Sequence, residues 1–496
     1  MNFYLTKLFV VYVCSHFGIF LISDAIYWDD WTLVDVNDEV ILDTMRQAGG
    51  FLNFPGYLHL GLSFFGPWIY KFLTFFMMFG AGIALDQIIK NYKSINSETR
   101  FVIVLFFLIL PLYWSRVALI NFFYTFCYFL FFLAWATNQR NRFLSMFLFF
   151  ISFNTNSLLV FFIIPFFEIY YRNTVHFFSL KSIIKFTLNR FELTLLPFIF
   201  FGAKVYFFSP YGLYEGHNEQ YDITALFNNP YLMFDTWYGW FYHFRHIHIY
   251  VYTAVGITLF YTYILKGDLF KTTGFTNKLI LTFLTGIFIF IIGGIPYWIL
   301  DKMPSFFDWS SRHQILFPLG MSIILVVFVS LLSKKLKAAA IVSVISFSTI
   351  MNVTVYKDLY IDWQKQKMIM KLISKNDMIR NGDILLFEDQ TKPLNAMLRQ
   401  YRFYEWNGLV ALAMGDENRF SVDRAQFPSF FNAPSFKLLY ENRDKYKSSN
   451  FNIYKQQVPI HIQINNVSNG PIDLMKEFAG IKLNIKIIKL PTITFN

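Results

Sequence analysis

Two adjacent carboxylates, Asp29 and Asp30, follow the first apolar stretch of the chain and stand between aromatic residues. Residues 3–22 are apolar and reach the ~20 residues that a helix needs to cross a bilayer. Lys7 lies near the start of that stretch and predicts a cytoplasmic N-terminus, so the carboxylates are expected at the outer membrane surface. Carboxylates at this boundary cost free energy unless they have a use, which makes them a candidate site. The alternative is a hydrated loop flanked by interfacial aromatic residues.

The chemistry open to such a carboxylate is general base catalysis. It can accept a proton from a hydroxyl nucleophile within hydrogen-bond reach. A cation must then stabilise the negative charge that grows on a departing phosphate. Arg312 and His313 in a later outer loop are candidates, as is Lys204 near the outer end of a predicted span. The alternatives are contact with lipid headgroups for Arg312 and His313, and snorkelling to the interface for Lys204.

The composition identifies a membrane protein. Of the 496 residues, 55% are hydrophobic and only 15% are charged, against about 25% charged in soluble domains. The formal charge of +11 comes mostly from Lys and Arg in short loops between apolar stretches, as topology control requires, so a nucleic-acid partner is not expected. Cys14 and Cys127 both fall in apolar stretches and predict neither a disulfide framework nor a metal site.

The alternation of loops predicts a polytopic α-helical fold with about 11 transmembrane helices in residues 1–355. Loops rich in Lys and Arg are placed on the cytoplasmic side. Three loops are placed outside, at residues 23–65, 209–246 and 301–314. Residues 356–496 then form an extracytoplasmic domain of α/β or α+β type, because charges rise there and the apolar runs shorten to strand length.

The outer loops hold further polar residues that could shape a pocket. In the first loop, Asn37 predicts the start of a short amphipathic helix that ends before a Gly-Gly pair and brings Arg46 near the carboxylates. Trp28 directly precedes the carboxylates. The long loop supplies Glu215 and Tyr221.

No metal site is assigned from the sequence. His243, His246 and His248 lie close together, but their spacing matches no zinc signature. The chain also has no nucleotide phosphate-binding loop, and the acidic pair faces the side where nucleotide sugars are scarce. A lipid-linked donor is therefore the more natural substrate.

The layout resembles the GT-C superfamily of polytopic glycosyltransferases. The similarity rests on the Tyr-Trp-Asp-Asp motif at residues 27–30 in the first outer loop, a surface helix in that loop, many spans and an extracytoplasmic C-terminal domain. Segments 310–314 and 403–408 are similar to those of bacterial members encoded with surface-polysaccharide genes. In that family an acidic residue of the first outer loop acts as catalytic base, or helps to hold a metal in some branches, and the donor is a polyprenyl-phosphate sugar.

The resemblance implies a glycosyltransferase of the bacterial inner membrane that uses Asp30 or Asp29 as the base, with Asp30 preferred. Arg312, Lys204 and His313 would hold the donor phosphate, and the sugar would pass with inversion to a glycan or lipid-linked acceptor at the outer face. A divalent cation is the only cofactor under consideration. One alternative is a polysaccharide polymerase or ligase, although such proteins typically use arginine-rich outer loops. The other is a lipid-glycan flippase, which requires charges along a path through the membrane.

Overall fold

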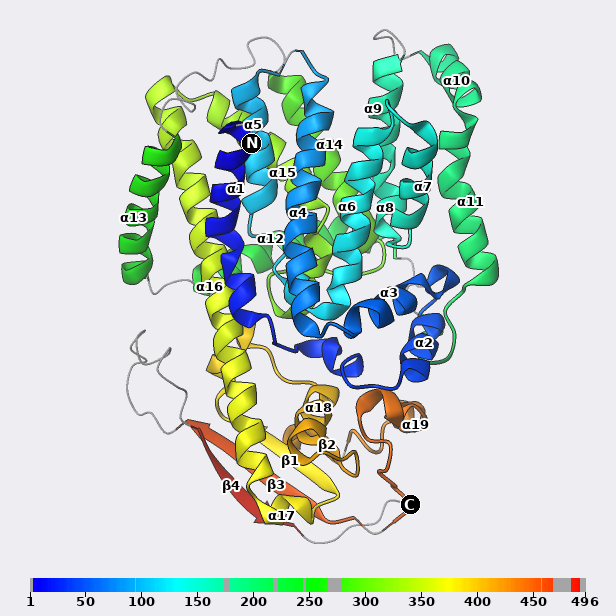
Figure 1. Cartoon of the computed structure of the whole chain (residues 1–496), viewed down its shortest axis with the longest axis vertical. Helices are drawn as coiled ribbons and strands as arrows, with labels where there is room; N and C mark the ends of the chain where they lie inside the picture. Colours follow the sequence, from blue (N-terminus) through cyan, green and yellow to red (C-terminus); the bar gives the residue numbers. More distant parts are fainter. Residues whose placement is uncertain are drawn as a thin grey trace.

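Two parts follow one another along the long axis of the molecule: a bundle of apolar helices and a smaller domain built on a sheet (Figure 1). The long helix α16 (Lys334–Ser374) runs from the first part into the second. The predicted domain boundary between residues 355 and 356 therefore lies within a continuous helix, which joins the two parts without a linker. This computed structural model describes residues 3–93, 95–173, 179–216, 222–243, 247–265, 279–427, 429–455, 457–466 and 483–490.

Five helices in the described residues are long and apolar enough to cross a membrane, or six if one bent pair counts as a single span. The bent pair joins Asp308–Gln314 to Phe317–Ser330 at an angle of 71°. The structure does not support the predicted count of about 11 spans, although it agrees with a helical membrane protein. The five segments are Tyr4–Ile22, Pro67–Lys90, Leu119–Thr137, Leu279–Trp298 and Leu336–Ser374.

The lower count arises because several apolar stretches form short helices. Helix α5 (Ser97–Ile109) is almost wholly buried, so its apolar sequence reflects packing on all sides and not contact with lipid. A polar turn interrupts the chain between α7 (Arg142–Ser152) and α8 (Ser157–Phe161). The other helices of the bundle are α1 (Phe3–His16), α4 (Pro67–Lys90), α6 (Phe122–Thr137), α9 (Ile163–Asn173), α10 (Leu180–Asn189), α11 (Phe191–Phe207), α12 (Ala225–His243), α13 (Ile247–Leu265), α14 (Leu279–Trp298) and α15 (Phe317–Ser330).

Two helices of the first outer loop, α2 (Asp38–Gln47) and α3 (Phe54–Ser63), lie across the end of the bundle that faces the sheet domain (Figure 1). The amphipathic helix predicted in this loop is confirmed. The Asn37 side chain accepts a hydrogen bond of 2.8 Å from the backbone N–H of Glu39 and so caps the start of α2. Gly49, with a φ of 74°, follows its end.

The sheet domain has the strand order β2-β1-β3-β4. Strands β1 (Ile384–Asp389), β2 (Phe420–Asp423) and β3 (Pro459–Asn466) are parallel, and β4 (Leu483–Lys489) pairs antiparallel with β3. In the register, Leu385 is opposite both Ser421 and Ile460. Apolar runs of strand length at residues 383–387 and 458–465 thus form β1 and β3, and the described part of the run at residues 481–488 lies in β4. Three helices complete the domain: α17 (Asp377–Arg380), α18 (Phe403–Met414) and α19 (Pro434–Glu441).

The core of the sheet domain is continuous with that of the bundle. Leu385 and Phe387 of β1 belong to the same buried cluster as the membrane helices, whereas Ile384 and Leu386 face a smaller cluster on the other side of the sheet. Short 3-10 segments fill the junction between the two parts: η2 (Trp28–Thr32), η5 (Leu119–Asn121), η6 (Gly212–Tyr214), η7 (Asp308–Gln314), η9 (Ala396–Leu398) and η11 (Arg443–Tyr446).

Candidate active site

The two neighbouring carboxylates have different surroundings. Asp30 is completely buried, and its two oxygens accept hydrogen bonds from the backbone N–H groups of Tyr27 (3.1 Å) and Ile120 (3.0 Å). The bond from Ile120 ties η5 to η2, whereas the bond from Tyr27 is local to η2. Burial raises the pKa of Asp30 to about 6, while the charge of Lys71 and the backbone donors act in the opposite direction. The buried, hydrogen-bonded position of Asp30 favours a structural role, although the sequence favoured Asp30 over Asp29 as the base.

Asp29 keeps part of its surface exposed. Burial raises the pKa of Asp29 above the usual value, and the nearby Tyr404 hydroxyl group and the charges of Arg312, Lys445 and Arg402 oppose this rise. Asp29 is thus an accessible carboxylate among cations, which is the environment that a base beside an anionic substrate needs.

Trp28 holds the backbone of the acidic pair in place. Its φ of 51° is rare for a bulky residue, so the surrounding structure must maintain it. The backbone N–H of Trp28 donates to Glu405 Oε1 at 3.1 Å. Its indole ring stacks on Trp309, with centroids 5.6 Å apart, and the Arg312 guanidinium lies 4.5 Å from the ring centroid on a face of the indole. The predicted pocket residue Trp28 is therefore part of the site.

Glu405 belongs to a buried ionic network that joins the two parts of the molecule. The Arg399 guanidinium donates to both Glu405 oxygens, at 2.5 and 2.8 Å, and to Asp362 of α16 at 3.2 Å. The Tyr401 hydroxyl also donates to Asp362. All four side chains are buried. The network fixes the N-terminal end of α18, and with it Tyr404, against the first outer loop.

The predicted phosphate-binding residues Arg312 and His313 belong to a series of side-chain contacts that continues through Tyr297 to Ser157. Arg312 Nε donates to His313 Nε2 at 3.1 Å, and the His313 ring packs 5.1 Å from that of Tyr297. The Tyr297 hydroxyl donates to Ser157 Oγ at 3.0 Å. The charge of Arg312 acts on Asp29 and opposes the rise of its pKa.

Lys204 contacts the polar turn that holds Ser157, at the end of this series away from Arg312. Its Nζ donates to Asn156 Oδ1 at 2.8 Å, in the same polar turn as Ser157. It contacts neither Arg312 nor Asp29 in the described residues. Lys204 is therefore separated from the acid by the turn, Tyr297 and His313, and does not belong to its immediate surroundings.

Two further predicted pocket residues have other surroundings. The Arg46 guanidinium lies 3.9 Å from Asp43 on the exposed side of α2, with 58% of its side chain exposed, because the helix turns Ile41 and Thr44 toward the protein. Arg46 therefore pairs within its own helix, and its predicted approach to the carboxylates is not supported. Glu215 is exposed in the turn after η6. Tyr221 lies outside the described residues.

The sequence reasoning missed the residues that the C-terminal domain and η6 contribute. Tyr404 acts on the pKa of Asp29, Glu405 accepts a hydrogen bond from the Trp28 N–H, and Lys445 Nζ donates to the Tyr214 hydroxyl at 2.7 Å. Tyr404 and Glu405 lie in segment 403–408, which the family resemblance singled out without giving it a role. Lys445 has no local signal, because its position depends on a contact with Tyr214, which is more than 200 residues away in the chain.

No metal centre is visible in the part of the chain that the structure describes, where no three His, Cys, Asp or Glu side chains could hold an ion. Of the histidine-rich segment, residues 244–246 lie outside this part. The divalent cation stays a prediction, and no chemical step is assigned to it.

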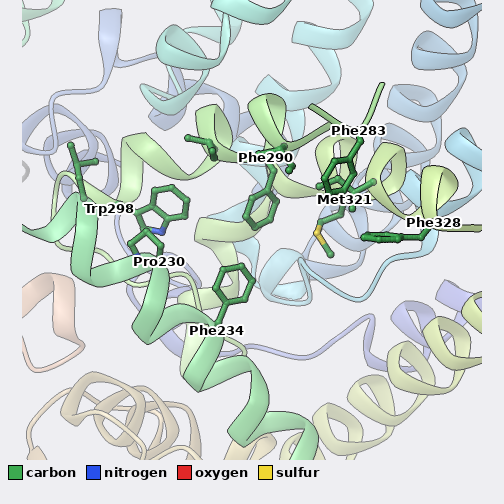
Figure 2. Close-up of a pocket in the computed structure, with 11 residues that line it drawn as sticks. Pro230, Phe234, Phe283, Phe290, Trp298, Met321 and Phe328 are labelled. Atoms are coloured by element: carbon green, nitrogen blue, oxygen red, sulfur yellow. The ribbon is translucent and has the colours of Figure 1, made fainter. Parts of the chain in front are cut away.

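An apolar groove of about 530 Å³ lies between α12, α14 and α15. Figure 2 shows Phe234, Phe290 and Met321 around it, with Trp298 at one end. Trp298 directly follows Tyr297, which packs on His313. It is lined by Leu226, Pro230, Phe234, Phe283, Ile287, Phe290, Ile291, Trp298, Met321, Ile324 and Phe328.

Comparison with known proteins gives no further identification: no family model, curated protein or solved structure matches this chain.

Proposed function

We propose that the protein is a membrane glycosyltransferase that moves a sugar from a polyprenyl-phosphate donor to a hydroxyl group of a glycan or lipid-linked acceptor. The observation that carries this proposal is the position of Asp29, a partly exposed carboxylate whose pKa responds to Tyr404 and to the charges of Arg312, Lys445 and Arg402. A base and several cations are the two requirements for displacing a phosphate from a sugar carbon.

In the proposed reaction Asp29 accepts the proton of the acceptor hydroxyl as its oxygen bonds to the anomeric carbon. The bond between that carbon and the phosphate oxygen breaks, and its electron pair stays on the phosphate. Arg312 stabilises this charge through its guanidinium, which the Trp28 ring and His313 hold in place. A single displacement of this kind inverts the anomeric centre.

The apolar groove supports a lipid-linked donor. Its lining is almost entirely hydrocarbon and aromatic, which suits an isoprenoid tail. Placement of the site on the outer face of the bacterial inner membrane rests on the distribution of Lys and Arg in the loops.

The proposal is tested with the purified protein in lipid nanodiscs, given a panel of radiolabelled polyprenyl-phosphate sugars and a lipid extract that contains the acceptor. We expect label to move to the acceptor and polyprenyl phosphate to appear in equal amount. Failure of every donor to release polyprenyl phosphate would contradict a transferase. Movement of an unaltered lipid-linked glycan across a vesicle membrane would instead indicate the flippase.

Narrowing the groove is expected to weaken use of long donors selectively. Ile287→Trp places a larger side chain in the groove, so the KM for a long-chain polyprenyl-phosphate sugar should rise about tenfold, as expected when an apolar chain loses contacts worth about 1.4 kcal/mol. The KM for a short-chain analogue should change little. Ile280→Trp, on the same helix but 77% exposed and outside the groove, is the matched control. Equal effects on both chain lengths would exclude the groove as the tail site.

Removing the hydroxyl group of Tyr404 is expected to change the pH dependence. That group stabilises the ionised form of Asp29, so Tyr404→Phe should raise the pKa of Asp29 further. A base works when deprotonated, and activity is therefore lost as pH falls through its pKa. The acid limb of the kcat/KM profile should move to higher pH in the variant. At pH values well above this limb, kcat/KM should fall less than it does within the limb. An unmoved acid limb would show that Asp29 is not the titrating base.

A further inference from the structure

The C-terminal domain places a lysine at the site. Lys445, in η11, is 7% exposed, and its Nζ donates to the Tyr214 hydroxyl at 2.7 Å. The same Nζ lies 4.7 Å from the centroid of the Tyr214 ring and 5.4 Å from that of Tyr446. In the described residues no carboxylate lies within ion-pair distance of it, although Asp29 lies within its electrostatic range. A buried ammonium held only by phenol groups is costly unless an anion completes its surroundings.

A second buried lysine in the same segment, Lys447, has different surroundings from those of Lys445. Lys447 is equally buried, at 6% exposed, and belongs to the same segment. Its Nζ donates to the backbone carbonyl of Asp35 at 2.9 Å, and the charges of Asp35 and Glu417 act on it. Lys447 therefore has acidic neighbours of its own and fastens the segment to the first outer loop. Lys445 also links its segment to the bundle, through the hydrogen bond to Tyr214, and the carboxylate charge that acts on it is that of Asp29.

The aromatic rings around Lys445 also connect it to the proposed base. Tyr446 stacks on Tyr404, with ring centroids 6.3 Å apart, and the Tyr404 hydroxyl group acts on the pKa of Asp29. Tyr214 comes from the bundle, so the lysine is positioned by groups from both parts of the molecule. The charge of Arg312, in η7, acts on the same acid.

We propose that Lys445 is a second ligand for the anionic phosphate of the lipid substrate, which the sheet domain supplies to complete a site begun by Arg312 in the membrane part. This inference rests on the proposed function for the nature of the ligand. It gives the C-terminal domain a direct part in substrate binding. A charged hydrogen bond of this kind contributes about 1.5–3 kcal/mol, so its loss weakens phosphate binding about 10- to 100-fold.

The test compares the binding of polyprenyl phosphate and of the uncharged polyprenol of equal chain length to the full-length protein in nanodiscs. Wild type is expected to bind the phosphate more tightly. Lys445→Met should weaken phosphate binding about 10- to 100-fold and leave polyprenol binding unchanged, and Lys445→Arg should restore most of the preference. Lys447→Met is the matched control and should keep the preference intact.

The outcomes separate the two proposals. Equal weakening of both lipids by Lys445→Met would show that the lysine only fastens the domain, and an unchanged phosphate preference in that variant would show that it does not bind the anion. Either result overturns the role of Lys445 alone. A wild-type protein that does not distinguish the phosphate from the alcohol would overturn the proposed function as well.

Discussion

Replacing Asp29 with Asn is expected to lower the transfer rate about 10² to 10⁴-fold, because the amide cannot accept the proton of the acceptor hydroxyl. The fold should survive, since Asp29 is partly exposed and Tyr404 can still donate to the amide oxygen. The measurement is the single-turnover transfer of labelled sugar in nanodiscs at saturating donor. Thermal unfolding in detergent should give a curve close to that of wild type.

Asp30→Asn is expected to show the opposite pattern, namely a loss of stability. An amide has one acceptor oxygen, so its nitrogen must face a backbone N–H of Tyr27 or Ile120 that has lost its acceptor. A buried donor left unpaired costs about 1–3 kcal/mol, and the variant should unfold at a lower temperature. Full activity in Asp29→Asn, together with a stable but inactive Asp30→Asn protein, would return the catalytic role to Asp30.

Replacing Arg399 with Met is expected to give the largest loss of stability in the C-terminal domain. The guanidinium is the shared partner of Asp362 and Glu405, both of which are almost completely buried. Its removal leaves two carboxylates without a cation, and breaking a buried pair in this way typically costs about 3–5 kcal/mol. Glu405 would also lose its orientation toward the Trp28 N–H, so the junction with the first outer loop should loosen. Urea unfolding monitored by limited proteolysis at the junction measures both effects.

Arg402 offers a control of the same residue type. Its ion pair with Asp308 spans 3.3 Å, and the two side chains are 57% and 41% exposed. Exposed pairs contribute about 1 kcal/mol or less, so Arg402→Met should change stability little. Equal losses in the Arg399 and Arg402 variants would show that the buried network does not hold the two parts together.

Local patterns in the sequence correctly predicted the elements that depend on near neighbours. The cap at Asn37 and Gly49, which follows Ala48, set the limits of α2. Alternating apolar residues marked β3 and β4 and a short apolar run marked β1, whereas β2 was not predicted. The count of spans was not predictable in this way. A helix such as α5 is apolar because other helices surround it. Hydropathy cannot distinguish a helix surrounded by protein from a helix surrounded by lipid.

The sequence by itself determined that this protein has apolar spans, a mixed α/β region and two acids at the end of its first apolar stretch. Only the tertiary structure decided which acid is accessible. Neighbouring side chains in a 3-10 turn point about 120° apart, so one of them can face the interior while the next faces the junction. The Ile120 N–H binds Asp30 and holds it in the interior, whereas Asp29 is partly exposed and Tyr404 acts on its pKa. Both partners are distant in the chain, and only the packing of the helices brings them to the first outer loop.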